Sequence, residues 1–127
     1  MKPLNILIVD DSEIIRDRIA EKLRQFGDAI KILQADNYSL ALKLFISSPP
    51  EIIILDIQLP DGDGMDLLNI IKTIAPSTHV IILTNYPFAV FKEHCAKCGA
   101  EFFFDKSNDF EKLQYAVNQI CTSDSIN

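Results

Sequence analysis

The chain has 127 residues, of which 48% are hydrophobic and 24% charged, values that fit one globular domain and exclude a disordered or collagen-like chain. Acidic residues outnumber basic ones by 18 to 12, and the formal net charge of -6 disfavours nucleic-acid binding, which needs a basic surface. No apolar run approaches the roughly 20 residues that span a bilayer, and no cleavage site follows the amino-terminus, so we expect neither a membrane segment nor a signal peptide.

Five short apolar runs alternate with amphipathic segments along the chain. The runs are rich in β-branched or aromatic residues and comprise residues 4–9, 30–33, 52–55, 80–83 and 102–104. A strand that is hydrophobic along nearly its whole length is covered on both faces, as in a parallel sheet between helices. The sequence therefore predicts five strands of a buried parallel sheet.

A helix is predicted after each strand from apolar residues spaced by three and four. The first helix begins at Ser12 and Glu13 and the second at Asn37, where serine and asparagine are favoured N-caps. The positions expected to face the core are, helix by helix, Ile15, Ile19, Leu23 and Phe26; Leu40, Leu44 and Phe45; Leu67, Leu68, Ile71 and Ile74; Phe88, Phe91 and Cys95; and Phe110, Leu113, Val117 and Ile120.

Proline and glycine mark the ends of the fourth helix, with Pro87 in its first turn and Gly99 beyond its last. Asn108 and Glu111 have the spacing of a capping pair for the fifth helix. Five strand–helix pairs predict an α/β fold of the (βα)5 type, with an open parallel sheet covered on both faces. We predict one domain over residues 1–122 and a polar, frayed tail at 123–127.

Polar residues stand at the carboxyl ends of the strands, where open α/β sheets bind their ligands. Asp10 and Asp11 follow the first strand, Asp56 follows the third, Thr84 ends the fourth and Lys106 follows the fifth. Two carboxylates about 4 Å apart repel by about 4 kcal/mol at an effective dielectric near 20. A hard divalent cation such as Mg2+ relieves this repulsion, so the sequence indicates a cation site.

A hydroxyl and a lysine beside such a site suit the oxygens of a phosphoryl group. A carboxylate can also act as a nucleophile and form an acyl phosphate. Asp56 is the best candidate, because it stands alone at its strand end and faces the pair that follows the first strand. Taken singly, Asp10 and Asp11 would be helix-capping acids and Asp56 a solvated loop acid; their combination favours the functional interpretation.

The same residues resemble the motifs of the receiver domains of bacterial two-component response regulators, over essentially the whole chain. The matching residues are Asp10 and Asp11, Asp56, the segment 59–64 (Leu-Pro-Asp-Gly-Asp-Gly), Thr84, Gly99 and Ala100, and Lys106. The resemblance implies a flavodoxin-like three-layer sandwich with the strand order 2-1-3-4-5. It also implies a cytoplasmic, single-domain phosphoprotein that acts on a downstream protein target and binds neither nucleic acid nor membrane.

The resemblance further implies that Asp56 accepts a phosphoryl group from a histidine kinase or a phosphotransfer protein. Asp11, Asp56 and the backbone carbonyl of Gln58 would ligate Mg2+, and Asp10 would assist through water. The chain would then catalyse only its own phosphorylation and dephosphorylation and would otherwise not be an enzyme.

Thr84 and Lys106 would contact the phosphoryl oxygens, and Thr84 with Phe103 would form a conformational switch. The output face would comprise the fourth helix, the fifth strand and the fifth helix. Three positions depart from the family pattern. Asn85 stands where most relatives have Ala or Gly, and its larger side chain would narrow the approach to the acceptor Asp56. Ser107 replaces a proline that usually follows a cis peptide bond. Phe103 has no hydroxyl, so a switch at this position would act by packing alone.

Two other classes of function remain open. A pseudo-receiver would bind partners through the same output face without phosphorylation. A flavodoxin-like carrier or an aspartate-nucleophile phosphatase is disfavoured, because residues 10–13 (Asp-Asp-Ser-Glu) would repel a phosphate without a metal and lack the D-x-D of such phosphatases.

Cys95 and Cys98 form a C-x-x-C motif beside His94. The motif lies late in its helix, where the dipole disfavours a thiolate, and a zinc site would need more ligands, so we interpret these cysteines as structural. Three cysteines without a disulfide framework favour a reducing cytoplasm. Residues 61–64 lack the spacing of a calcium loop and are predicted to be a turn, and His79 is predicted to be a surface residue.

Overall fold

The computed structural model describes residues 3–85 and 89–126, with the backbone alone at 89–90 and 124–126. Within these residues it contains a five-stranded sheet, a two-stranded hairpin, five α-helices and two 3-10 helices. In chain order the elements are β1 (Leu4–Val9), α1 (Glu13–Leu23), η1 (Arg24–Ala29), β2 (Ile30–Ala35), α2 (Tyr38–Ser47), β3 (Ile52–Leu55), β4 (Gln58–Leu59), β5 (Gly62–Asp63), α3 (Gly64–Ile74), β6 (His79–Thr84), α4 (Ala89–Lys97), β7 (Phe102–Asp105), η2 (Phe110–Lys112) and α5 (Leu113–Ile126). No helix of the described residues is long and apolar enough to cross a bilayer.

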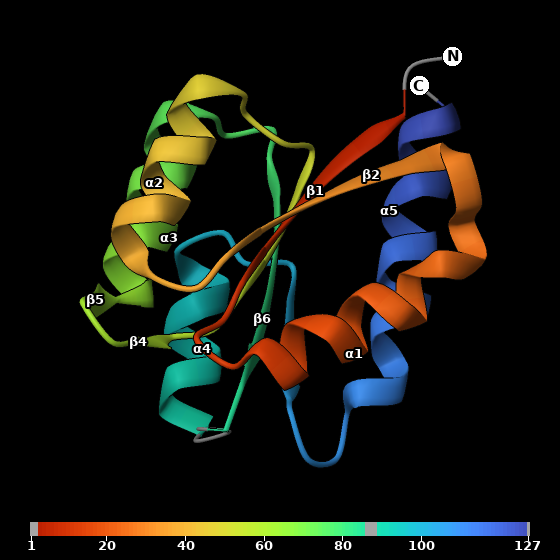
Figure 1. The fold of residues 1–127 in the computed structure, drawn as a ribbon. Coiled ribbons are helices and arrows are strands. Elements are labelled where there is room, and N and C mark those ends of the chain that lie inside the picture. The colour runs from red at the N-terminus through yellow and green to blue at the C-terminus, as the bar shows by residue number, and fades with distance from the viewer. Residues whose placement is uncertain (1–2, 86–88, 127) are drawn as a thin grey trace.

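The large sheet is parallel throughout, in the order β2-β1-β3-β6-β7 (Figure 1). Because β4 and β5 form a separate hairpin, this is the order 2-1-3-4-5 for the five main strands, and that prediction is confirmed. All four residues of β3 are buried, and so are most residues of β1 and β6. The strand order reverses between β1 and β3, which places a ligand crevice at the carboxyl ends of these two strands.

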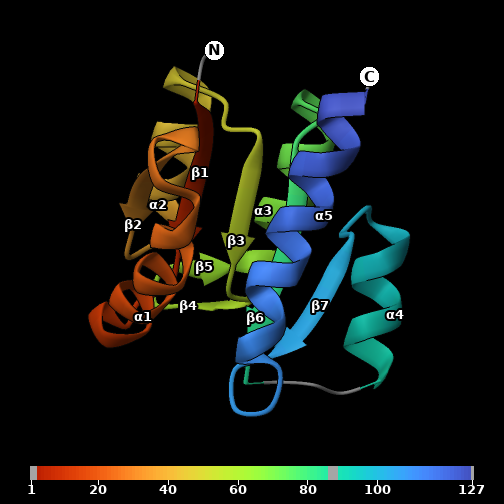
Figure 2. The ribbon, with the colours of Figure 1, turned by 90° about the vertical axis from the view of Figure 1, so that its right-hand side faces the viewer.

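Helices cover both faces of the sheet, so the three-layer sandwich is confirmed. One face carries α2, α3 and α4, and the other carries α1 and α5 (Figures 1 and 2). Successive strand residues point to opposite faces: in β1, Leu7 and Val9 belong to the core under α2, α3 and α4, whereas Ile6 and Ile8 belong to the core under α1 and α5. Each fully buried aliphatic side chain stabilises the fold by about 1.5–3 kcal/mol.

The predicted caps of the first two helices are confirmed. Ser12 Oγ accepts a hydrogen bond from the Ile15 N–H at 3.3 Å, and Asn37 Oδ1 accepts one from the Leu40 N–H at 2.8 Å. Each bond satisfies an amide that has no partner inside the helix. The polar residue before each apolar stripe therefore sets where α1 and α2 begin.

Some predicted core positions are exposed. The apolar residues of a helix extend around more of its circumference than the side that packs against the sheet. Leu40, Ile74 and Phe91 are 37%, 58% and 38% exposed, so their placement in the core was wrong. Helix α2 instead buries Ala41 and Phe45, one turn apart. Pro87 and Phe88, predicted for the start of the fourth helix, lie outside the described residues.

The start of α5 also differs from the prediction. Asn108 and Glu111 do not form a capping pair: Asn108 Nδ2 donates to Asp105 Oδ2 at 2.6 Å, and Glu111 pairs with Lys22 of α1 at 2.7 Å. The 3-10 helix η2 leads into α5, which continues through Ile126, past the point at which we placed the start of a frayed tail.

An ion network ties α3, β6 and β7 together at the amino ends of these strands. Lys72 Nζ donates to the Thr78 carbonyl at 2.6 Å and lies 3.6 Å from a Glu101 carboxylate oxygen. The other oxygen of Glu101 lies 2.6 Å from His79 Nδ1. His79, predicted to be a surface residue, has a half-buried ring that this network holds in place.

Asp61, in the turn of the small hairpin, adds a cap to α2 that the sequence did not reveal. Its two carboxylate oxygens accept hydrogen bonds from the Tyr38 N–H at 2.6 Å and the Ser39 N–H at 3.1 Å. These bonds, the Tyr38 bond first, hold the pKa of Asp61 below its ordinary 3.8. The hairpin and α2 thus support each other through one side chain.

We expect Asp61→Ala to lower the free energy of unfolding at pH 7, because two amides at the start of α2 lose their acceptor. A carboxyl with a lowered folded-state pKa stabilises when ionised, so the difference from wild type should be complete above pH 3.8 and shrink as the pH falls further. Urea unfolding across this pH range measures it. Asp17→Asn, at an exposed acid of α1, is the control, and a deficit that persists unchanged at low pH would contradict the cap.

Candidate functional site

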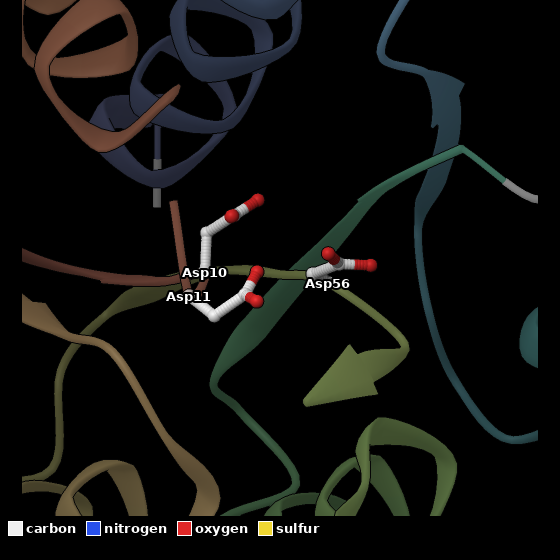
Figure 3. A group of neighbouring side chains, drawn as sticks. All are labelled: Asp10, Asp11 and Asp56. Carbon is white, nitrogen blue, oxygen red and sulfur yellow. The ribbon is translucent and has the colours of Figure 1, made fainter. Parts of the chain in front are cut away.

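The predicted acidic residues meet at the carboxyl ends of β1 and β3. Asp10 and Asp11 follow β1 and Asp56 follows β3, and one carboxylate oxygen from each lies within 4.8 Å of the others (Figure 3). Asp10 is 1% exposed and Asp56 5%, whereas Asp11 is exposed to solvent. The site therefore contains two buried carboxylates, and a third carboxylate that is in contact with solvent.

Lys106 joins the two buried carboxylates. Its Nζ lies 2.6 Å from Asp10 Oδ2 and 2.8 Å from Asp56 Oδ2, and its side chain is only 9% exposed. Burial lowers the pKa of Lys106, but the hydrogen bonds to the two carboxylates outweigh burial and leave that pKa raised. The lysine is therefore a fixed positive charge, and three carboxylates around one ammonium leave two negative charges unbalanced.

Asp10 is anchored through its backbone and its side chain. Its N–H donates to the Ala35 carbonyl at 3.1 Å, its carbonyl accepts from Arg16 Nη1 at 2.8 Å, and its Oδ1 accepts from the Ser12 N–H at 2.9 Å. Burial raises the pKa of Asp10 and outweighs the lowering effect of Lys106 and Ser12. Arg16 was missed by the sequence analysis, although a basic residue in the first turn of the helix that follows an acidic pair was a signal for it.

Asp56 is held by its own strand and by the hairpin that follows. Its N–H donates to the Val9 carbonyl at 3.0 Å, and its Oδ1 accepts from the Gln58 N–H at 3.1 Å. The segment 61–64 was predicted to be a turn, but only Asp61 lies in the turn of this hairpin, because Gly62 and Asp63 form β5 and Gly64 begins α3. The metal-ligand role of the Gln58 carbonyl stays a prediction.

Gly64 allows the hairpin to close against the end of β3. Its N–H donates to the Ile57 carbonyl at 2.6 Å. A Cβ at this position would lie 2.7 Å from Ile57 Cα and closer still to the Asp56 carbonyl oxygen. Any side chain here would therefore displace the backbone that carries Asp56.

Thr84 brings a hydroxyl to the same end of the sheet. It is 0% exposed, and its Oγ1 is the one buried side-chain oxygen or nitrogen of the described residues that lacks a hydrogen-bond partner. Its carbonyl accepts from the Lys106 N–H at 2.9 Å, so the two residues are linked. Leaving a buried hydroxyl unpaired costs about 1–3 kcal/mol, and the predicted contact of Thr84 with a ligand would supply the missing partner. The next residue, Asn85, is exposed.

Phe103 lies in β7, opposite Ile82 of β6. It is half-buried and packs against the core under α2, α3 and α4, whereas Phe102 and Phe104 pack on the other face of the sheet. The part of Phe103 in a conformational switch stays a prediction. The peptide bond between Lys106 and Ser107 is trans, as are the other described peptide bonds.

Comparison with known proteins agrees with this geometry. The family model of the response regulator receiver domain matches residues 6–118. The chain belongs to this family. Among solved structures, the receiver domain protein from Clostridium thermocellum is 28% identical, with a TM-score of 0.84 over 97% of this chain and 98% of that chain. A DrrB receiver domain described as BeF3-activated is 26% identical, with a TM-score of 0.84 over 94% of this chain and 98% of that chain.

The curated relatives are longer than this receiver domain. The Fimbriae Z protein of Salmonella typhimurium is 31% identical over 120 residues, which are 94% of this chain and 57% of that protein. A putative response regulator, NtrX-like, of Rickettsia felis is 35% identical over 123 residues, which are 95% of this chain and 26% of that protein. The chain thus spans little more than half, or less, of these relatives.

The donor set fits Mg2+. Receiver domains generally bind this cation at an acidic cluster, and oxygen donors of this kind are its preferred ligands. The two unbalanced negative charges match the charge of one divalent cation. Lys106 partly neutralises the same carboxylates. The cation and the ammonium therefore both offset the negative charge of this one cluster.

We expect Lys106→Met to lower the free energy of unfolding by about 3–5 kcal/mol in EDTA, because removing one partner of a buried pair leaves buried charge uncompensated. Added Mg2+ should then stabilise the variant more than it stabilises the wild type, since binding to the folded state raises stability. Denaturant unfolding with and without Mg2+ measures both effects.

Lys72→Met is the matched control, because Lys72 is also a half-buried lysine paired with an acid, at the opposite end of the sheet. Mg2+ should stabilise Lys72→Met only as much as it stabilises the wild type, because this variant keeps the acidic cluster and Lys106. Equal effects of Mg2+ on the two variants would show that removing the ammonium of Lys106 does not strengthen binding of the cation, and would contradict the shared charge balance.

Proposed function

We propose that this receiver domain accepts a phosphoryl group on Asp56 from a phosphohistidine and uses Mg2+ in doing so. The observation that carries the proposal is the buried Thr84 hydroxyl without a partner, linked through the backbone to the lysine that contacts Asp56. A phosphoryl group on Asp56 would provide oxygens for both the hydroxyl and the ammonium.

In this proposal a carboxylate oxygen of Asp56 forms a bond to phosphorus while the bond from phosphorus to the donor's histidine nitrogen breaks. Lys106 is already within 2.8 Å of Asp56 Oδ2, so it can donate to a phosphoryl oxygen after a small movement. The Gln58 N–H holds Asp56 Oδ1 and fixes the direction of attack. Asp11, Asp56 and the Gln58 carbonyl, with Asp10 through water, would hold Mg2+, which would supply charge that neutralises the phosphoryl oxygens.

Membership of the family implies a kinase or phosphotransfer partner. We propose that the partner is a histidine kinase or a phosphotransfer protein and that the protein is located in the cytoplasm. We also propose that the signal passes to a protein target through the surface formed by α4, β7 and α5. We further propose that the domain catalyses only its own phosphorylation and dephosphorylation, and that Phe103 carries the change from the site to this face.

We expect the wild type to gain one phosphoryl group, about 80 Da, from acetyl phosphate with Mg2+, and none in EDTA. Asp56→Asn should gain none, because its amide is not a nucleophile, whereas the surface control Asp17→Asn should label as wild type does. Intact-mass spectrometry measures the gain. Failure of the wild type to label with acetyl phosphate or with any histidine kinase would favour the pseudo-receiver, and labelling of Asp56→Asn would place the acceptor elsewhere.

We expect Phe103→Ala to accept the phosphoryl group but to lose most of the conformational response. Burial of a Phe ring is worth about 1.5–3 kcal/mol, enough to shift a two-state population about tenfold or more. NMR shift changes at Phe91 and Lys97 on adding beryllofluoride measure the response. Phe102→Ala, on the opposite face of β7, should keep the shift changes at Phe91 and Lys97. An undiminished response in Phe103→Ala would show that the Phe103 ring only packs in the core and does not transmit the change.

A further inference from the structure

Two cysteines mark the end of α4: Cys95 lies in its last turn and Cys98 directly follows the helix. Cys95 is fully buried and Cys98 is half-buried, and both contact the core under α2, α3 and α4. Gly99 stands just beyond the helix, and its φ of 103° suits glycine. The Gly99 N–H donates to the Ala96 carbonyl at 3.1 Å and the Ala100 N–H to the Cys95 carbonyl at 2.9 Å, which is the Schellman pattern of a helix end.

The two cysteines are close enough to be joined. Residues three apart in a helix have Cα atoms about 5 Å apart, within the range of roughly 4.4–6.8 Å found in disulfides. The disulfide also needs Cβ atoms about 3.5–4.5 Å apart, so the last turn must tighten. A terminal turn closed by a glycine is the part of a helix that can change most easily.

The two thiols have different surroundings. Cys95 Sγ contacts Met65 Sδ of α3 at 3.2 Å, and burial raises the pKa of Cys95 to about 11. Cys98 Sγ lies 3.8 Å from Nε2 of His94, which is exposed one turn earlier. The imidazole is a base that can take the proton of the neighbouring thiol, and among the two cysteines only Cys98 is described beside such a group.

We propose that Cys98 and Cys95 are a modification site for hydroperoxides, at which Cys98 is oxidised first and Cys95 then closes a disulfide across the last turn of α4. The sequence alone favoured structural cysteines because of the helix dipole. The position of the His94 ring changes this interpretation. The inference does not depend on phosphorylation of Asp56.

The chemistry balances in two steps. Cys98 gives its proton to His94, and its sulfur attacks the hydroperoxide; the sulfur–oxygen bond forms, the oxygen–oxygen bond breaks, and the proton leaves with the alcohol. Cys95 then attacks the sulfenic sulfur of Cys98; the disulfide forms, the sulfur–oxygen bond breaks, and the hydroxide leaves with the Cys95 proton as water. Two thiols lose two electrons in total, and one hydroperoxide gains them.

The disulfide changes how α4 packs on α3. Cys95 Sγ now contacts Met65 Sδ at 3.2 Å, and the tightened turn draws that sulfur toward Cys98. Met65 is one of two methionines in the chain, the other being Met1. Its methyl group is therefore an easily assigned reporter of the state of the pair.

The test treats the wild-type chain with hydrogen peroxide, blocks the remaining thiols under denaturing conditions and digests with trypsin without reductant. Lys97 lies between the two cysteines, so trypsin separates residues 93–97 from residues 98–106. Only a bond between Cys95 and Cys98 keeps these peptides together. We expect the joined pair, its loss on reduction, an intact mass lower by about 2 Da, and a shifted Met65 methyl resonance.

Three variants sharpen the result. Cys121→Ser should form the same joined peptides, Cys98→Ser should leave the Met65 resonance unmoved by peroxide, and His94→Gln should give the same product several-fold more slowly. A chain-to-chain disulfide, or Cys98 oxidised to a sulfinic acid with Cys95 still a thiol, would overturn the proposal. Oxidation of His94→Gln at the wild-type rate would overturn the assignment of the imidazole as the base.

Discussion

The ammonium of Lys106 connects three strands at the end of the sheet where the site lies. It follows the edge strand β7 and lies 2.6 Å and 2.8 Å from carboxylates that follow β1 and β3. Burial by itself lowers the pKa of Lys106, but the hydrogen bonds to the two carboxylates outweigh that effect and leave the pKa raised. Any change in charge at Asp56 therefore acts directly on Lys106, and through it on the end of β7.

The rest of the site supports this contact. Arg16 and the Ala35 carbonyl hold the backbone of Asp10, and Gly64 lets the small hairpin close against the backbone of Asp56. The carboxylates are thereby held together although they repel each other, and the ammonium balances only part of their charge. A divalent cation and a phosphoryl group are the two kinds of ligand that such an arrangement favours.

Both of the chemical sites that we propose would affect the packing of helix α4. Under the proposed function, a phosphoryl group would act on β7 and so on Phe103, which packs in the core shared by α2, α3 and α4. A hydroperoxide would act on the last turn of α4, through Cys95, which contacts the same core. Both would change the packing of one helical layer, although they enter at different ends of it.

The sequence by itself determined the strands, the parallel sheet, the caps at Ser12 and Asn37, and the acidic and basic residues of the site, because these follow from local periodicity and from the rule that carboxyl ends of parallel strands meet. It did not determine which side of an apolar helix is buried, as Leu40 and Ile74 show. It also did not reveal the contacts of Arg16 with Gln34 and of Asp61 with the start of α2. Those contacts depend on distances between side chains and backbone from different turns or elements, and only the packed tertiary structure decides such distances.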